Sequence, residues 1–359
     1  MNIVVIGAGY AGAVAANRLA KKVPDAAITV VNPRPDFIER VRLHQELAGS
    51  GSAATPLSEV LAPGIATYLG AVGKIGDGAL VLDDGTELDF DYAVVAVGST
   101  ADPLPGTLTT GTWEGAQQTR AALDALPADS SVTVIGGGLT GMETASEIAE
   151  ARPGLRVRLV SREIGASLSA RGQRSALRVL RRLGVECVTD EIDRVEPGRV
   201  HLSSGATLAT DLVLWSVISA VPDLVARSGL AVDATGRAVV DESLRSVSDP
   251  RVFVVGDCAA VPGMRMACAT AGPQGAHAAD TLVRILRGDA PQPFSMGYAG
   301  QGISLGRHDA VLQSTRRDDS PLPLHLTGRV AAVFKERIVR YAAYSARSGV
   351  SVALPGPRR

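Results

Sequence analysis

The chain has 359 residues, enough for two or three domains, and 46% of them are hydrophobic, which suits a large buried core. Its formal net charge of −1 gives no long-range attraction to nucleic acid or to anionic lipid, so we expect no nucleic-acid partner. The three cysteines, Cys187, Cys258 and Cys268, are odd in number and include no CxxC pair. This usage argues against a disulfide framework and favours the reducing cytoplasm. The five histidines are scattered, so no metal site is predicted.

The first part of the chain predicts one dinucleotide-binding unit. Residues 2–6 form a buried apolar run, residues 11–21 a helical stretch and residues 28–31 a second apolar run, which is a βαβ pattern. Residues 65–92 alternate between apolar and polar side chains with glycine turns between them, which predicts an antiparallel meander. Residues 92–97 then return to a buried strand that stops at Gly98. The stretch 102–111 is rich in proline, glycine and threonine and predicts a linker.

A second βαβ pattern covers residues 132–160, and another meander is expected over residues 185–208. Residues 211–218 predict a buried strand. Residues 251–257 form one more buried strand that ends in Gly-Asp, and residues 267–286 form a helix. Because this late strand suits the first unit, the second unit is expected to be inserted into the first.

The predicted fold class is therefore α/β, with two Rossmann-like domains, the second inserted in the first, and a small C-terminal α+β domain. The expected boundaries are residues 1–110 with 242–290, residues 111–241, and residues 291–359. The arginines of residues 171–182 predict the solvated face of an amphipathic helix. A signal peptide and a transmembrane segment are not expected, and the tail after Pro355 is not apolar enough to predict tight membrane association.

Two glycine-rich turns carry the chemistry. Their defining residues are Gly7, Gly9 and Gly12 in the first turn and Gly136, Gly138 and Gly141 in the second. Each turn follows a β-branched run and opens a helical stretch, so it presents backbone N–H groups and a helix N-terminus to a pyrophosphate. Two such turns predict two dinucleotides, most economically a flavin that stays bound and a nicotinamide that exchanges.

Together with Gly256-Asp257, these turns resemble the two-dinucleotide-binding-domain flavoproteins, in which the first turn holds FAD and the inserted one holds NAD(P)H. Residues 42–47 lack the cysteine pair that disulfide reductases need. Finer features resemble type II NADH:quinone oxidoreductases and the ferroptosis suppressor branch of apoptosis-inducing-factor-like proteins. The matching stretches are 136–143, 256–259, 304–310, 328–329 and 335–336. This resemblance implies hydride transfer from NAD(P)H to FAD and electron transfer to a quinone or quinone-like acceptor.

The resemblance assigns several residues to FAD. Asp257 would bind the ribityl chain, although a helix N-cap is the alternative. Asn32 replaces the acid expected to bind ribose hydroxyls, and its amide can still form a hydrogen bond. We expect Arg34 to lie over the adenine or near a phosphate of FAD, or else to be simply solvated. The remaining expected FAD contacts are Val72, Gly98, Met266 and Ala267.

The resemblance places Glu143 near the nicotinamide. The alternative is that Glu143 is one exposed member of a helical pair with Glu147. Ser161 and Arg162 replace the acid that would repel a 2′-phosphate, so we expect the protein to use NADPH at least as readily as NADH. The alternative is that Arg162 is an ordinary surface arginine. Residues 217–219 read Val-Ile-Ser where a glycine is expected, and their side chains could crowd the nicotinamide.

His44 is the candidate catalytic histidine, because an imidazole titrates near neutral pH and could protonate a quinone. Gln45 and His308 are further candidates, and a core or loop histidine is the alternative. Two other functions stay open: a biosynthetic flavoenzyme acting on a specific metabolite, and a non-catalytic NAD(P)H-binding redox sensor. The sequence permits a homodimer.

Overall fold

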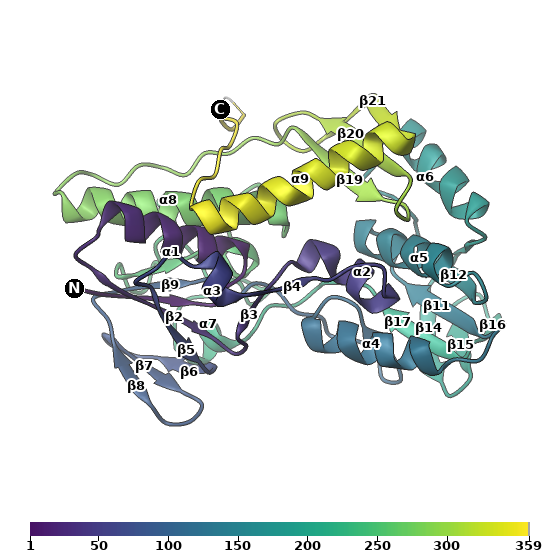
Figure 1. The fold of residues 1–359 in the computed structure, drawn as a ribbon, viewed down its shortest axis with the longest axis horizontal. Helices are drawn as coiled ribbons and strands as arrows, with labels where there is room; N and C mark the ends of the chain where they lie inside the picture. Colours follow the sequence, from purple (N-terminus) through teal and green to yellow (C-terminus); the bar gives the residue numbers. More distant parts are fainter. Residues whose placement is uncertain (358–359) are drawn as a thin grey trace.

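The structure, a computed structural model, describes residues 1–357 and contains two five-stranded parallel sheets that lie side by side (Figure 1). The first sheet has the order β18-β9-β1-β2-β5. Its strands are β1 (Asn2–Ile6), β2 (Ala27–Asn32), β5 (Ala66–Leu69), β9 (Tyr92–Val95) and β18 (Val252–Val254). All five run parallel, and β18 joins β9 after the chain has completed the second sheet. The insertion predicted from the late Gly-Asp strand is therefore present in the topology.

Two helices of the first unit pack unusually closely. These are α1 (Tyr10–Lys22) and α8 (Cys268–Leu286). A Cβ built on Gly275 of α8 would lie 2.2 Å from the carbonyl oxygen of Ala11, so only glycine permits this approach. The close packing holds the N-termini of both helices at the carboxyl edge of the sheet, where ligands bind in such folds.

The second sheet has the order β10-β17-β11-β12-β13. Its strands are β10 (Leu108–Thr109), β11 (Ser131–Ile135), β12 (Arg156–Ser161), β13 (Glu186–Thr189) and β17 (Leu212–Trp215), and its helices are α4 (Trp113–Ala125), α5 (Leu139–Ala151) and α6 (Ala170–Arg182). Helix α6 buries Ala176, Val179 and Leu180 and exposes its arginines, as predicted. β10 lies within the stretch expected to be only a linker.

Short antiparallel sheets extend from both units. They are formed by β6 (Val72–Ile75), β7 (Ala79–Leu82) and β8 (Glu87–Asp89), and by β14 (Ile192–Glu196), β15 (Arg199–Leu202) and β16 (Thr207–Ala209). The two predicted meanders were each too long, because β5 and β13 join the parallel sheets instead. Alternation of apolar and polar residues indicates a strand but does not identify its partner.

Smaller elements connect these layers. They are β3 (Asp36–Ile38), η1 (Arg40–Arg42), α2 (Leu43–Ala48), β4 (Ala54–Pro56), α3 (Leu57–Val60), α7 (Leu224–Arg227) and η2 (Gly256–Cys258). Helix α2 packs between α4 and α5 and so brings a segment of the first unit against the second.

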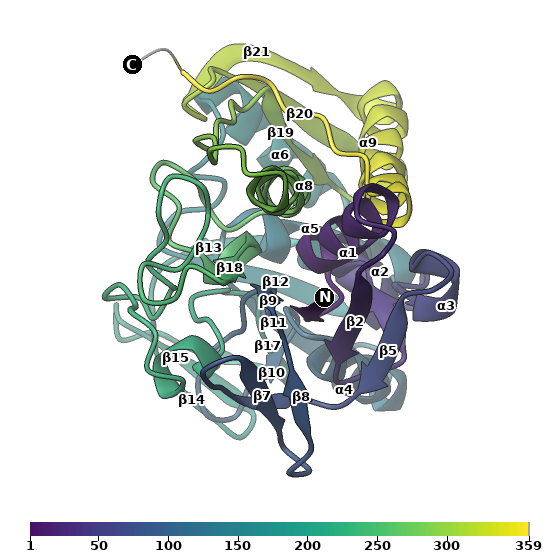
Figure 2. The same cartoon turned by 90° about the vertical axis from the view of Figure 1, so that its left-hand side faces the viewer.

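The C-terminal part forms a three-stranded antiparallel sheet followed by one long helix. The elements are β19 (Gly300–Ser304), β20 (Ala310–Thr315), β21 (Pro321–Thr327) and α9 (Gly328–Ser348). Helix α9 lies along the outside of the molecule, from β20 and β21 at one end to α1 at the other (Figures 1 and 2). Among the helices of residues 1–357, none combines the length and apolarity that a bilayer crossing requires.

Candidate active site

The first glycine turn has the geometry of a pyrophosphate cradle. Gly7 has a φ of +95°, and a Cβ on Gly12 would lie 1.9 Å from the Gly7 carbonyl oxygen, so both positions require glycine. A Cβ on Gly9 would meet nothing within 4 Å, which leaves the backbone there open to a ligand. The Oδ1 atom of Asn32 accepts a 3.0 Å hydrogen bond from the N–H of Ala8, so this side chain also holds the turn itself.

The second turn repeats this geometry. Gly136 has a φ of +119°, a Cβ on Gly141 would lie 1.8 Å from the Gly136 carbonyl oxygen, and Gly138 is open. Each turn leads directly into a helix whose N-cap is a glycine without a capping side chain. Both turns therefore fit the phosphates of a dinucleotide, since free N–H groups and the helix dipole point at the open side.

Asp257 lies within a small polar cluster at the end of β18. Its Oδ2 accepts a 2.6 Å hydrogen bond from Ser99 Oγ and lies 3.7 Å from Arg40 Nη1. Arg40 also donates to the carbonyl oxygens of Ser99 and Gly111, which ties the carboxylate to the linker. The helix N-cap alternative is wrong, because Ala267 occupies that position at the start of α8.

The other predicted FAD contacts lie around the same edge. Gly98 has a φ of +73° just before Ser99, and Met266 and Ala267 immediately precede α8. Val72 is buried at the start of β6. Arg34 pairs with Glu114 at 2.5 Å, so its guanidinium is held beside α4. These FAD assignments stay predictions, and the geometry of the turn is compatible with them.

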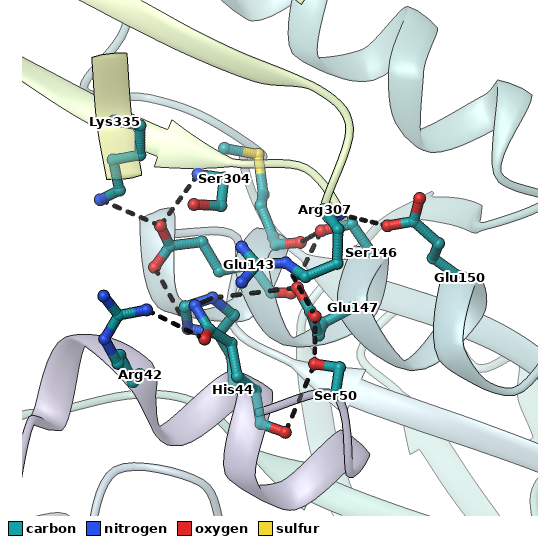
Figure 3. A network of polar contacts seen from close by, with 12 residues as sticks. Arg42, His44, Ser50, Glu143, Ser146, Glu147, Glu150, Ser304, Arg307 and Lys335 are labelled. Atoms are coloured by element: carbon teal, nitrogen blue, oxygen red, sulfur yellow. Dashed lines mark hydrogen bonds and ion pairs between the residues drawn. The ribbon is translucent and has the colours of Figure 1, made fainter. Parts of the chain in front are cut away.

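Glu143 lies where four segments meet, with only 12% of its side chain exposed (Figure 3). Its Oε1 lies 3.3 Å from Lys335 Nζ of α9 and accepts a 2.9 Å hydrogen bond from the N–H of Ser304 in β19. Its Oε2 lies 3.9 Å from Nδ1 of His44 in α2. The predicted alternative, an exposed helical pair with Glu147, is wrong because both carboxylates point inward toward His44.

Glu147 closes the other side of the histidine. Its Oε2 lies 3.9 Å from His44 Nε2, and its Oε1 lies 3.2 Å from Arg307 Nε and accepts a hydrogen bond from Ser50 Oγ. Only 1% of its side chain is exposed. Arg307 and Lys335 join the two glutamates from positions distant in sequence, so the helical spacing of Glu143 and Glu147 alone could not have indicated this cluster.

The charges of this cluster follow from burial and pairing. Burial is the main reason that the pKa of His44 falls to about 4, so the imidazole is neutral near pH 7. Burial opposes ionisation of Glu143, but Lys335, His44 and the Ser304 N–H together lower its pKa, so it is a carboxylate. Burial raises the pKa of Glu147 above its usual value, with Arg307 and Ser50 opposing the shift.

The remaining candidates separate into two groups. Gln45 lies beside His44, with 3.5 Å between Gln45 Nε2 and His44 Nε2, and accepts a hydrogen bond from Arg42. His308 lies on the surface with 77% of its side chain exposed, about 4.0 Å from Glu150. The structure thus brings Gln45 to the buried cluster and leaves His308 outside it.

The nicotinamide side combines expected and unexpected features. A Cβ on Gly137 would lie 2.8 Å from Ser161 Oγ, so Ser161 borders the second turn. Arg162 is largely exposed, and its Nη2 lies 3.5 Å from Glu191. A Cβ on Gly136 would lie 3.0 Å from Cγ2 of Val217, which places that side chain against the turn.

The two parallel sheets, each ending in a glycine turn that fits a dinucleotide, define a flavoprotein with two dinucleotide-binding domains. The chain belongs to the pyridine nucleotide-disulphide oxidoreductase family, whose model matches residues 1–280. The flavoproteins of this family use FAD and NAD(P)H, so the chain is an NAD(P)H-dependent flavin oxidoreductase.

Relatives support the finer resemblance seen in the sequence. The chain is 32% identical over 292 residues to NADH dehydrogenase-like protein Rv1812c of Mycobacterium tuberculosis, covering 72% of each protein. It is 26% identical to ferroptosis suppressor protein 1 of Taeniopygia guttata, covering 87% of this chain and 88% of that one. The fold matches sulfide:quinone oxidoreductase of Aquifex aeolicus with a TM-score of 0.79 at 19% identity, over 97% and 92% of the two chains. The predicted resemblance is thereby confirmed.

Proposed function

We propose that the protein passes electrons from NAD(P)H through FAD to a quinone or quinone-like acceptor in the cytoplasm. The observation that carries this proposal is the composition of the cluster around Glu143. It contains His44 of α2 and no cysteine pair. All three cysteines are free, which leaves no internal disulfide to receive the electrons and is compatible with a reducing compartment. The acceptor is therefore an external molecule.

The chain's own residues would bind and orient the reactants. The open backbone at Gly9 and Gly138 suits the two pyrophosphates, and Asp257 suits a hydroxyl of the ribityl chain. FAD, when bound, supplies hydride acceptance and electron release. Glu143 is held as an oriented carboxylate by Lys335, so it accepts a hydrogen bond or a proton from a neighbouring group. His44, whose pKa is about 4, is neutral near pH 7 and orients neighbouring groups by hydrogen bonding, so the expectation that it titrates near neutral pH and protonates the acceptor is wrong.

Steady-state oxidation of NAD(P)H with and without a water-soluble quinone tests the proposal. We expect turnover to depend on quinone concentration and to fall about tenfold or more in Glu143→Gln, since general acid–base groups typically contribute at least that much. His308→Gln is the matched control, because His308 is exposed and lies outside the buried cluster. Oxidation of NAD(P)H at the same rate without quinone would contradict the acceptor assignment.

A biosynthetic flavoenzyme is the second candidate, and one observation favours it. Ile218 is β-branched and follows β17, in the stretch where the resemblance expects a glycine beside the nicotinamide, and its Cγ1 would lie 3.2 Å from a Cβ built on Gly111. Oxidoreductase ptaL of Pestalotiopsis fici is 27% identical to this chain, covering 86% of it and 90% of the relative. If neither nucleotide reduces the flavin, electrons would come from a metabolite and this candidate would replace the first.

A further inference from the structure

Arg40 holds the segment that leads from the first sheet to the second. Its Nη1 donates to the carbonyl oxygen of Ser99 over 3.0 Å and to Ser99 Oγ over 2.9 Å. Its Nη2 donates to the carbonyl oxygen of Gly111 over 2.9 Å. We call residues 99–111 the connecting segment, because β9 precedes it and α4 follows it. One guanidinium therefore binds both ends of the connecting segment from a third part of the chain, η1.

The same guanidinium reaches the carboxylate that suits FAD. Ser99 Oγ accepts a hydrogen bond from Arg40 and donates one to Asp257 Oδ2 over 2.6 Å. Arg40 Nη1 itself lies 3.7 Å from that carboxylate oxygen. A Cβ on Gly98 would lie 3.6 Å from the same Nη1, which places the guanidinium beside the glycine that precedes the connecting segment. The position of Asp257 therefore depends on how the start of this segment is held.

The far end of the connecting segment lies near the second glycine turn. A Cβ on Gly111 would lie 3.2 Å from Cγ1 of Ile218. A Cβ on Gly136 would lie 3.0 Å from Cγ2 of Val217, the residue that precedes Ile218. A series of contacts thus runs from the carboxylate at the predicted FAD site, through the connecting segment, to the second turn.

We propose that Arg40 is a positioning residue that couples the two dinucleotide sites, so that a nucleotide on the second glycine turn slows the release of FAD. A bound pyrophosphate fixes the second turn and the residues packed on it, and bound FAD fixes Asp257. Because Arg40 joins these parts, the ligand that binds second meets a connecting segment that is already ordered. Such coupling is reciprocal between the two ligands. The proposal rests on the use of FAD and a nicotinamide dinucleotide and is independent of the electron acceptor.

Neutralising Asp257 would not require this arrangement. The three short hydrogen bonds of Arg40 all go to the connecting segment, whereas its Nη1 stays 3.7 Å from the carboxylate. A guanidinium presents its N–H groups in a rigid planar fork, so it can bind two backbone carbonyls at once. A second brace lies close by, since the N–H of Thr100 donates to the carbonyl oxygen of Ala220 over 2.8 Å. That bond does not include Asp257, and it involves no side chain that the test below replaces.

The rate at which FAD leaves the diluted holoenzyme, followed by the rise in flavin fluorescence, tests this coupling. The probes are ADP-ribose and its 2′-phosphate, which carry the pyrophosphate but no nicotinamide and so cannot stack on the flavin. In the parent protein we expect saturating nucleotide to slow FAD release about fivefold or more, the lower end of typical couplings. In Arg40→Met and in Ser99→Ala the effect should fall below about twofold, because each variant breaks the series of contacts. Ser99→Ala keeps both carbonyl bonds and removes only the link to Asp257, so it remains the test if Arg40→Met retains too little FAD.

The matched control is Arg152→Met. Arg152 also joins the two units, because it donates to the carbonyl oxygen of Ala48 and pairs with Asp124 at 2.6 Å, and it should keep the full nucleotide effect. Flavin content and melting temperature verify that each variant is folded, and titration calorimetry verifies nucleotide binding. Binding without slower FAD release in the parent would overturn the coupling alone, whereas failure of both nucleotides to bind would overturn it together with the NAD(P)H site. An unchanged effect in both Arg40→Met and Ser99→Ala, or an equal loss in Arg152→Met, would remove this role from Arg40.

Discussion

Ile218 occupies in the second domain the position that Gly98 occupies in the first. Ile6 pairs with Val95, and Ile135 pairs with Trp215. The first residue of each pair immediately precedes the glycine turn of its domain. Counting three residues onward from the second member of each pair gives Gly98 and Ile218.

The segments that follow also pair with each other. The N–H of Thr100 donates to the carbonyl oxygen of Ala220 over 2.8 Å, and these residues hold equivalent positions in the two domains. Gly98 has a φ of +73°, whereas Ile218 is not among the residues of positive φ. The equivalence therefore identifies Ile218, rather than Val217, as the residue that replaces the expected glycine.

Replacing Ile218 by glycine should speed reduction of the flavin by NAD(P)H. Reacting atoms must approach within about 3–3.5 Å, and a misplacement on the order of 1 Å can cost about 100-fold in rate. We expect a gain of about tenfold or more at saturating nucleotide, measured by rapid mixing and flavin bleaching. Val217→Gly is the comparison and should give a smaller gain. A parent protein that already bleaches within milliseconds, with no gain in Ile218→Gly, would show that this side chain is harmlessly packed.

Asp257→Ala should lose most of the bound FAD. The substitution removes the acceptor of the Ser99 hydrogen bond and leaves Arg40 without its nearest carboxylate. Flavin absorbance per mole of purified protein measures occupancy, and the pigment released by heat should be FAD. Asp84→Ala, an exposed turn aspartate near β8, is the control and should keep full occupancy. Full occupancy in Asp257→Ala would remove this carboxylate from the cofactor site.

NADPH should reduce the flavin at least as well as NADH, because Ser161 and Arg162 replace an acid. Arg162→Ala should weaken NADPH selectively, since a guanidinium binds a 2′-phosphate that NADH lacks. Arg158→Ala is the control: Arg158 lies on β12, which Arg162 directly follows, and its Nε pairs with Glu186 at 2.7 Å. A preference of tenfold or more for NADH, roughly 1.4 kcal/mol, would contradict the assignment.

Folding stability should fall as the pH drops from about 7 to 5. The pKa of His44 is about 4 in the folded protein and 6.5 when unperturbed. As the pH falls, the unfolded chain therefore takes up a proton before the folded protein does, and this uptake favours the unfolded state. This histidine alone should account for roughly 2 kcal/mol of the loss between pH 7 and pH 5. Denaturant unfolding at both pH values measures the loss, and His44→Gln should shrink it by about that amount. An equal loss in both proteins would mean that other groups cause it.

Local sequence patterns determined most of the fold. Buried apolar runs, glycine turns and the late strand before Asp257 predicted both parallel units and the insertion, because each pattern is set by residues near one another in the chain. The turns at Gly7 and Gly136 were identifiable for the same reason, since positive φ and close backbone contacts demand glycine there.

The tertiary structure decided what depends on distant partners. The burial of Glu143 and Glu147 around His44 requires α2, α5 and α9 to meet, and a helical spacing of four residues cannot distinguish a buried pair from a solvated one. The partners of β5 and β13 were equally undetermined. Periodicity reports which residues share a face, but only packing determines whether that face meets protein or the surroundings.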